Sequence, residues 1–270
     1  MKEVELLPIG VFDSGVGGIS ALAQLIAIIP NEKYIYYGDS KNAPYGTKAT
    51  TEVMVRSLEV ADILIKKGIK LLVVACNTAT SAAIVPLREK LDIPVIGMEP
   101  ALKPAVKLNN HKKIVVMATP VTLKEKKFSN LILQFENEAD IIKLPAPGLV
   151  EIIEKHGSKS KDLEAYLKRL FYGLDLSKVS TIVLGCTHYV FIKDTIRNVV
   201  GNNVDLIDGN YGTAIHVKSL LSGKENNQVD EHTSVQIMSS STSKAMVNLS
   251  KRLLEEELHK LNHKGSIKYV

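Results

Sequence analysis

The sequence predicts an α/β fold with two similar domains, each built on a parallel sheet. Short apolar runs alternate with segments of helical periodicity, which is the pattern of parallel strands covered by helices. The length of 270 residues fits one large domain or two modest ones, and we favour two. Two apolar runs end in cysteine in nearly the same way, at Leu71–Thr78 and at Ile182–His188. This near-duplication indicates matching positions in the two domains.

The first series of elements alternates strands and helices up to residue 97. Its strands are expected at Ile9–Asp13, Tyr34–Tyr37, Lys70–Ala75 and Pro94–Gly97, and its helices at Ser20–Ile29, Thr51–Lys67 and Thr80–Lys90. Each strand is a short apolar run bounded by turn residues, and each helix repeats its apolar residues with helical spacing. This alternation predicts one complete parallel sheet.

A second series follows the stretch from Pro100 to Pro104, which we take as the crossing between domains. Its strands are expected at Ile114–Ala118, Ile141–Leu144, Thr181–Leu184 and Val204–Ile207, and its helices at Val121–Phe135, Leu149–Glu154, Leu163–Tyr172 and Phe191–Val200.

The tail contains another strand, Val235–Met238, and an amphipathic helix, Met246–Leu258, after a polar loop at residues 226–232. Chain termini often lie close together, so we expect this tail to return to the first domain. The expected boundaries are 1–98 with 211–270 for the first domain and 99–210 for the second.

Composition excludes several classes of protein. Hydrophobic residues make up 45% and charged residues 23%, which argues against disorder. The net charge of +5 comes with only 5% aromatic residues, so the stacking surface of a nucleic-acid-binding protein is missing. No apolar stretch approaches the ~18 residues of a membrane span, and the N-terminus lacks the apolar core of a signal peptide. We therefore expect a cytoplasmic protein with reduced thiols.

The two cysteines are the strongest indication of chemistry. Cys76 and Cys186 follow predicted buried strands, and open α/β sheets bind ligands at the carboxyl ends of their strands. Two thiols that face one substrate from opposite sides could act as the two bases of a racemase. Asp13 and His188 are the natural proton partners. The alternative is that each buried cysteine is only a small hydrophobic residue.

Other strand ends and loops carry groups that suit a carboxylate or a hydrogen-bonding ligand. Asp13, Ser14 and a glycine-rich turn follow the first strand, Tyr45 and Gly46 lie in a loop after the second, and Thr119 precedes a helix that starts with proline. Ordinary turns and a helix N-cap remain alternative readings.

A zinc site is the chief competitor for these residues. Cys76, Cys186, His188 and Asp13 could supply four ligands, but zinc ligands usually come in close pairs, and only Cys186 and His188 are near neighbours. We therefore expect no metal.

Four motifs together resemble the bacterial glutamate racemases of the aspartate/glutamate racemase superfamily. They are Phe12–Gly18, Gly38–Asp39 with Pro44–Gly46, Ala75–Ala79, and Leu184–Tyr189. The resemblance extends from about residue 9 to residue 210. It implies two α/β domains related by pseudo-twofold symmetry, with the active site in the cleft between them.

The resemblance also implies the chemistry of each site residue. Cys76 and Cys186 would be the catalytic acid/bases, with Cys186 removing the α-proton of L-glutamate, Asp13 assisting Cys76 and His188 assisting Cys186. The substrate-binding residues would be Asp13, Ser14, Tyr45, Gly46, Asn77, Thr78, Thr119, Thr187 and His188, with Glu151 as a supporting carboxylate. No cofactor is expected, and the expected assembly is a homodimer that supplies D-glutamate for peptidoglycan.

Two alternatives stay open at this point. One is a related thiol-pair racemase that acts on aspartate, and the other is a metal- or ligand-binding protein without catalytic activity. Turnover of L-glutamate by metal-free protein would separate them.

Overall fold

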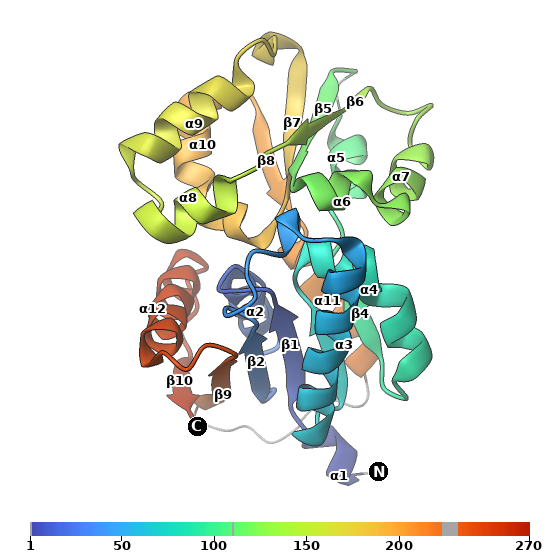
Figure 1. Ribbon diagram of the computed structural model, residues 1–270, viewed down its shortest axis with the longest axis vertical. Helices are drawn as coiled ribbons and strands as arrows, with labels where there is room; N and C mark the ends of the chain where they lie inside the picture. The colour runs from blue at the N-terminus through green and yellow to red at the C-terminus, as the bar shows by residue number, and fades with distance from the viewer. Residues whose placement is uncertain (1, 110, 223–231) are drawn as a thin grey trace.

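The computed structural model describes residues 2–109, 111–222 and 232–270. The chain forms two lobes, one above the other in Figure 1, and each lobe contains one parallel sheet with helices on both faces. The first and last described residues of the chain lie at the bottom of the lower lobe (Figure 1). The lower lobe is called lobe 1 and the upper lobe is called lobe 2.

Lobe 1 is built on a six-stranded sheet with the order β10-β9-β2-β1-β3-β4. Its strands are β1 (Ile9–Asp13), β2 (Tyr34–Gly38), β3 (Leu71–Val74), β4 (Val95–Gly97), β9 (His232–Ser239) and β10 (Ser266–Tyr269). Its helices are α1 (Lys2–Glu5), α2 (Ile19–Ile28), α3 (Thr50–Lys66), α4 (Asn77–Lys90), α11 (Asn210–Leu221) and α12 (Lys244–Lys260). Val11 packs in the core beneath α2, α11 and α12, whereas Phe12 packs in the core beneath α3 and α4. Successive side chains of a strand point to opposite faces, so an almost wholly apolar strand serves both cores.

Lobe 2 repeats this plan with a four-stranded sheet in the order β6-β5-β7-β8. Its strands are β5 (Lys113–Ala118), β6 (Ile141–Pro145), β7 (Val179–Gly185) and β8 (Asp205–Asp208). Its helices are α5 (Leu102–Leu108), α6 (Pro120–Lys124), α7 (Lys126–Leu133), α8 (Leu149–His156), α9 (Lys161–Phe171) and α10 (Lys193–Val200). Val116 packs with α5, α6 and α7, and Val115 packs with α8, α9 and α10.

The two sheets share one strand order. Strands β2-β1-β3-β4 of lobe 1 correspond one by one to β6-β5-β7-β8 of lobe 2, and every pairing is parallel. In each sheet the order reverses beside the first strand of the series, and ligands of open α/β sheets bind at such a reversal. The prediction of two similar parallel-sheet domains is confirmed.

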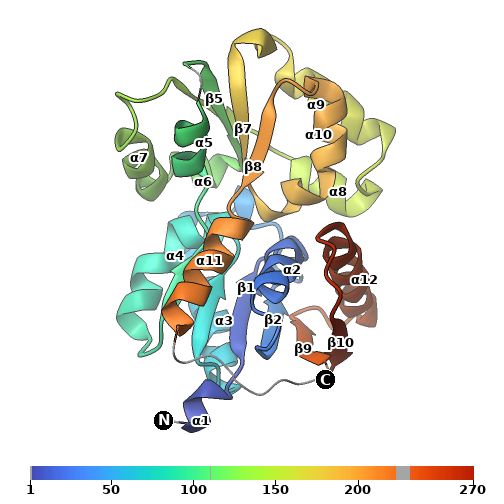
Figure 2. The same ribbon diagram turned by 180° about the vertical axis from the view of Figure 1, so that it is seen from behind.

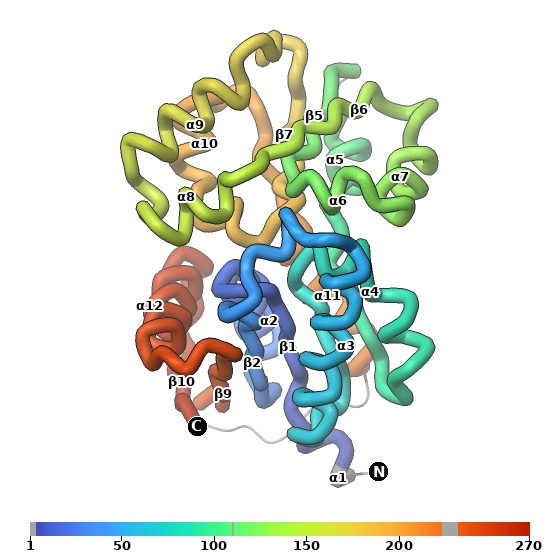
Figure 3. The backbone as a smooth tube through the Cα atoms, viewed as in Figure 1, coloured from blue at the N-terminus to red at the C-terminus, as the bar shows by residue number. Residues whose placement is uncertain are grey.

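The chain crosses between the lobes twice, and the two crossings lie side by side. One leads from β4 to α5 and the other from β8 to α11, as the turned view and the tube show (Figures 2 and 3). A Cβ atom added at Gly209 would lie 2.6 Å from the carbonyl oxygen of Glu99 and 2.7 Å from Met98 Sδ. Glycine is therefore required where the two segments touch.

Several elements differ from the sequence prediction. The helix expected at Val121–Phe135 is two helices, because Glu125 adopts an extended conformation between α6 and α7. The helix expected from Phe191 starts as a 3₁₀ segment, η3 (Thr187–Ile192), before α10. Helices α5 and α11 and strand β10 were not predicted. The loop expected at 226–232 lies outside the described residues, except that His232 begins β9.

Among the helices of the described ranges, none has both the length and the apolar character needed to cross a bilayer.

Candidate active site

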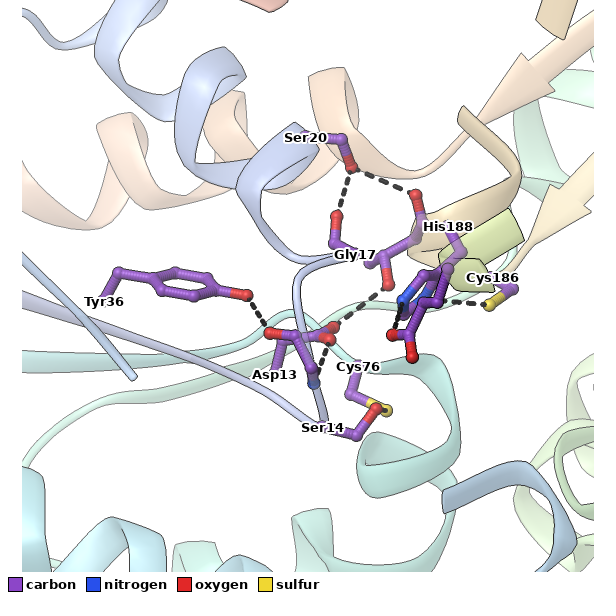
Figure 4. A network of polar contacts seen from close by, with 11 residues as sticks. Asp13, Ser14, Gly17, Ser20, Tyr36, Cys76, Cys186 and His188 are labelled. Carbon is purple, nitrogen blue, oxygen red and sulfur yellow. Dashed lines mark hydrogen bonds and ion pairs between the residues drawn. The ribbon is translucent and has the colours of Figure 1, made fainter. Parts of the chain in front are cut away.

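Cys76 lies where β3 meets α4, at the edge of lobe 1 that faces lobe 2. It is the N-cap of α4, and its Sγ accepts a hydrogen bond from the Ala79 backbone N–H at 3.4 Å. The thiol donates to Ser14 Oγ at 3.5 Å (Figure 4), and the residue is 5% exposed. Burial, followed by the nearby negative charge of Asp13, raises the pKa of the Cys76 thiol to about 12. The thiol therefore carries a proton at neutral pH.

Cys186 occupies the corresponding place in lobe 2, directly after β7. It precedes the 3₁₀ segment η3 and is 8% exposed. Its Sγ lies 4.0 Å from His188 Nδ1, and Figure 4 shows the imidazole beside the sulfur. Each thiol thus has its own polar partners, Ser14 in lobe 1 for Cys76 and His188 in lobe 2 for Cys186.

His188 is buried and is held from its other side by a carboxylate. Its Nε2 lies 2.8 Å from Glu154 Oε1 on α8, and the Glu154 side chain is 30% exposed. Burial opposes a charge on the ring, but the contacts with Cys186 and Glu154 outweigh burial and raise the pKa of His188 well above its usual range. A protonated imidazole can stabilise a thiolate at Cys186.

Asp13 ends β1 and connects the two lobes. Its Oδ1 accepts from the Gly15 backbone N–H at 2.9 Å, and its Oδ2 accepts from Thr187 Oγ1 of lobe 2 at 3.0 Å. Complete burial raises the pKa of the Asp13 carboxyl, although the positive charge of His188 and these hydrogen bonds lower it in part. No hydrogen bond between Asp13 and Cys76 is described, so Asp13 acts on that thiol through its charge.

Three buried threonines join the lobes on another part of the cleft. Thr78 of α4 lies 2.9 Å from Thr119 and 3.2 Å from Thr122, measured between hydroxyl oxygens, and Thr119 and Thr122 are 2.9 Å apart. Thr119 also caps α6 by accepting from the Thr122 backbone N–H. Thr122 was missed from the sequence because its side chain reads as part of an ordinary first helical turn.

Tyr45 and Gly46 form the part of lobe 1 that touches this threonine cluster. A Cβ atom at Gly46 would lie 2.7 Å from Thr119 Cγ2, so only glycine fits. The Tyr45 hydroxyl donates to Asp39 Oδ2 at 2.6 Å, and the residue is 1% exposed. Asp39 thus fixes the loop that brings Gly46 to lobe 2.

Asn77 adds an acceptor with no partner in the described part of the chain. The residue is 5% exposed, and its Oδ1 makes no hydrogen bond to the described residues. A buried unpaired amide oxygen is unfavourable unless a ligand donates to it, and an amino group is such a donor.

The structure gathers most of the predicted site residues at the facing edges of the two lobes. Glu151 also lies at this boundary, but the carboxylate that contacts His188 is Glu154, one turn later on α8. Glu151 instead lines a shallow gap with Gly46 and Thr119. The sequence shows two acidic residues on one amphipathic helix but does not say which one meets the histidine.

A zinc site at Cys76, Cys186, His188 and Asp13 is the competing alternative from the sequence. Within residues 2–109, 111–222 and 232–270, no group of three His, Cys, Asp or Glu side chains is placed to hold a metal ion.

Comparisons with known proteins agree with this arrangement. A family model described as Asp/Glu/Hydantoin racemase matches residues 14–220. A glutamate racemase from Clostridium novyi (strain NT) is 48% identical over 255 residues, which cover 93% of this chain and 98% of that protein.

Two solved structures have the same fold across nearly the whole chain. The crystal structure of a glutamate racemase isoform from Bacillus anthracis has a TM-score of 0.84 and 27% identity, with 98% of both chains covered. A glutamate racemase from Francisella tularensis, solved in complex with D-glutamate, has a TM-score of 0.80 and 27% identity, also with 98% of both chains covered. The chain therefore belongs to the Asp/Glu/hydantoin racemase family.

Proposed function

We propose that this protein interconverts L-glutamate and D-glutamate without a cofactor and so supplies D-glutamate for peptidoglycan. One arrangement supports this activity most strongly: two thiols stand at equivalent strand ends of facing lobes, and each has its own polar partners. Inversion at Cα requires removal of a proton from one face and delivery of a proton to the other, and two groups on opposite sides of the substrate can do this. The high similarity to glutamate racemases supports glutamate as the substrate.

The two thiols have different surroundings. Cys76 is protonated, because burial and Asp13 raise its pKa to about 12, whereas Cys186 Sγ lies 4.0 Å from Nδ1 of His188, an imidazole whose own pKa is raised well above its usual range. In this state Cys186 removes the α-proton of L-glutamate and the Cys76 thiol delivers a proton to the opposite face. After turnover the states are exchanged, which suits the reaction from D-glutamate.

The surrounding groups supply binding and stabilisation of the carbanion-like transition state. We assign substrate binding to Asp13, Ser14, Tyr45, Gly46, Asn77, Thr78, Thr119, Thr187 and His188, and a supporting role to Glu154 in place of Glu151. Fixed hydroxyls and amides that exclude water stabilise developing charge better than mobile water does. The unpaired Asn77 Oδ1 suits the substrate ammonium.

The wider biological setting is proposed on the same basis. We propose that the catalytic unit comprises one domain of residues 1–98 with 211–270 and a second of residues 99–210. Thiols that must stay reduced favour a cytoplasmic location. The working assembly is proposed to be a homodimer.

Isotope transfer from deuterated water tests the two-thiol mechanism. L-glutamate converted in D₂O should give D-glutamate that carries solvent deuterium at Cα from its first formation, while the recovered L-glutamate labels far more slowly. The reason is that Cys186 returns the original proton to substrate, whereas Cys76 delivers a solvent-derived one. Mass spectrometry of both enantiomers at low conversion makes the measurement. Retention of the original hydrogen in early D-glutamate would indicate one shared base and overturn the mechanism.

Removal of metals tests the alternative in which the same residues bind zinc. Activity should survive dialysis against a strong chelator, because both proton transfers are assigned to protein thiols. Loss of activity on chelation, with recovery on addition of zinc, would support the metal alternative. Turnover of aspartate faster than glutamate would move the substrate assignment to a related racemase.

A further inference from the structure

Ser20 lies outside the groups assigned to the reaction, yet it joins the two lobes directly behind them. It is the second residue of α2 in lobe 1 and is 2% exposed. Its hydroxyl oxygen lies 2.9 Å from the carbonyl oxygen of Gly17 and 3.3 Å from the carbonyl oxygen of Thr187 in lobe 2 (Figure 4). A hydroxyl has a single proton, so the two carbonyls share one donor.

Thr187 is therefore attached to lobe 1 at two points. Its carbonyl meets Ser20, and its side-chain hydroxyl donates to Asp13 Oδ2 at 3.0 Å. One hydrogen bond leaves a residue free to rotate about that bond, but two bonds from different atoms fix its orientation. Because Thr187 stands between Cys186 and His188 in the chain, this orientation also determines where those two side chains lie.

The backbone of lobe 1 at Gly17 lies close to the turn of lobe 2 that is formed by residues 186–188. A Cβ atom at Gly17 would lie 2.4 Å from Thr187 Oγ1 and 2.4 Å from His188 Nδ1. No side chain can therefore stand at position 17 while the turn of lobe 2 rests there. Gly17 makes the space, and Ser20 supplies the hydrogen bond that holds the turn in that space.

The two thiols depend on this contact unequally. Cys76 donates a hydrogen bond to Ser14 Oγ and accepts one from the Ala79 backbone N–H, both in lobe 1, and neither bond involves the turn at Thr187. Cys186 and His188 belong to that turn. A change at Ser20 should therefore misplace the base on the Cys186 side more than the thiol on the Cys76 side, which the turn reaches only through the bond from Thr187 to Asp13.

We propose that Ser20 is a positioning residue that acts through the Thr187 carbonyl to set the Cys186–His188 pair against the substrate. The inference rests on the proposed function, since it assigns Ser20 to one of two proton transfers. Ser20 itself touches neither thiol in the described contacts. Its loss should slow the step at Cys186 without unfolding either lobe.

The test compares Ser20→Ala with Ser57→Ala as a matched control. Ser57 is also a fully buried helical serine, and its hydroxyl donates to Val53 O at 2.7 Å within α3, away from lobe 2. Ser20→Ala should lower kcat/KM about 10-fold, because small misplacement of a reacting group has effects of this order. Ser57→Ala should stay within about 2-fold, as for a change that leaves the reacting groups in place. The equilibrium constant between enantiomers is unity, so the fall must be equal in both directions.

Primary isotope effects with Cα-deuterated substrates give a readout that a general structural defect does not change. With Ser20→Ala, removal of the proton from L-glutamate by Cys186 becomes more rate-limiting, so the isotope effect on kcat/KM for L-glutamate should rise. In the reverse direction the slowed step is reprotonation by Cys186, so the effect for D-glutamate should fall. Gly17→Ala should push the same turn away. It should therefore raise the isotope effect for L-glutamate and lower the effect for D-glutamate, as Ser20→Ala does, and by larger amounts.

The outcomes separate the two proposals. A wild-type protein that racemises glutamate, with isotope effects unchanged in Ser20→Ala, would overturn the role of Ser20 alone. Equal shifts in Ser57→Ala would do the same, because the effect would then not depend on the contact with Thr187. A wild-type protein that racemises neither enantiomer would overturn the proposed function and this inference with it.

Discussion

The two cysteines have the same place in the two sheets but different surroundings, and the reaction needs this difference. Replacement of either sulfur by oxygen should remove one of the two bases. Cys76→Ser and Cys186→Ser are each expected to lower racemisation by at least about 10³-fold, because a hydroxyl is too weak an acid to supply a base near neutral pH. Chiral chromatography of the product makes the measurement, and circular dichroism checks the fold. A folded variant with activity within a few-fold of wild type would contradict the role of that thiol.

Burial of Cys76 also makes a prediction about stability. The thiol pKa is raised to about 12 in the folded protein, whereas an unfolded thiol ionises near ~8.5. As the pH rises, the thiol therefore loses its proton first in the unfolded state. The contribution of this group to the free energy of unfolding is full below pH ~8.5 and is lost as the pH rises from there toward the pKa of the folded state. Between pH 8 and pH 10, the free energy of unfolding of the wild type should fall by about 1 to 2 kcal/mol more than that of Cys76→Ser. Urea unfolding at the two pH values measures this difference, and parallel pH dependences of the two proteins would contradict it.

The carboxylate behind His188 offers a matched pair of variants on one helix. Glu154→Gln removes the charge that helps to raise the pKa of His188, so the imidazole should lose its proton at lower pH and the alkaline limb of the activity profile should move to lower pH. Glu151→Gln, one turn earlier, is the control and should leave that limb in place. The pH dependence of kcat/KM for L-glutamate provides the measurement. A shift in Glu151→Gln alone would restore the assignment made from sequence.

Sequence predicted where the candidate site residues lie in the fold when they directly follow a buried strand. Cys76, Asn77 and Thr78 follow a buried strand, and Cys186, Thr187 and His188 follow its counterpart, so their edge of the sheet could be predicted. Glu154, Thr122 and Ser20 could not, because each lies inside a helix where acidic and hydroxyl residues are common. Their importance arises from which helix faces the other lobe, and that is a tertiary property.

At the scale of elements, apolar patterning predicted the central strands and most of the helices. Strand β10 was not predicted because it has only four residues, lies at the edge of the sheet, and alternates exposed and half-buried side chains. Helix α11 was not predicted because it begins with Asn210-Tyr211-Gly212, residues that suggest a turn. The break between α6 and α7 occurs at Glu125, whose carboxylate accepts from Thr50 of lobe 1. This contact between the lobes lies at the break, and a pattern of local helix propensity does not show it.

Strand β7, which positions Cys186, contains a buried threonine that allows a test at this scale. Thr181 is fully buried, and its hydroxyl has no partner among the described residues. Thr181→Val keeps the branched shape suited to a strand and removes an unpaired polar atom, so it should stabilise the protein by up to about 1 kcal/mol with activity unchanged. Thermal unfolding and a racemisation assay measure the two effects. Destabilisation would show that the hydroxyl is satisfied in solution.

The molecule as a whole is in a closed state. Both thiols are almost fully buried, and hydrogen bonds between the lobes lie at Thr187 and at the threonine cluster of Thr78, Thr119 and Thr122. Substrate can reach the thiols only if these contacts open, as in enzymes whose lobes close on their ligand.

Opening can be measured through the reactivity of the thiols. Alkylation of Cys76 and Cys186 by iodoacetamide should be slow, and saturating D-glutamate should slow it further, about 10-fold or more, because bound substrate favours the closed state. Mass spectrometry of the two cysteine peptides over time gives both rates. Alkylation at the rate of a free thiol, unaffected by glutamate, would show that the closed state is not the main state in solution.

The neighbouring crossings at Glu99 and Gly209 make lobe 2 one continuous segment of the chain that is inserted into lobe 1. All four strands of lobe 2 lie between the crossings, whereas the sheet of lobe 1 is completed only by β9 and β10 near the end of the chain. A ribosome therefore releases lobe 2 entire while lobe 1 is still missing its last two strands, and domains generally fold as units as they emerge. Lobe 2 should therefore fold first, while the segments of lobe 1 on either side of it do not yet form a complete sheet. Cys186 would then lie in a folded lobe before β9 and β10 complete the sheet that carries Cys76.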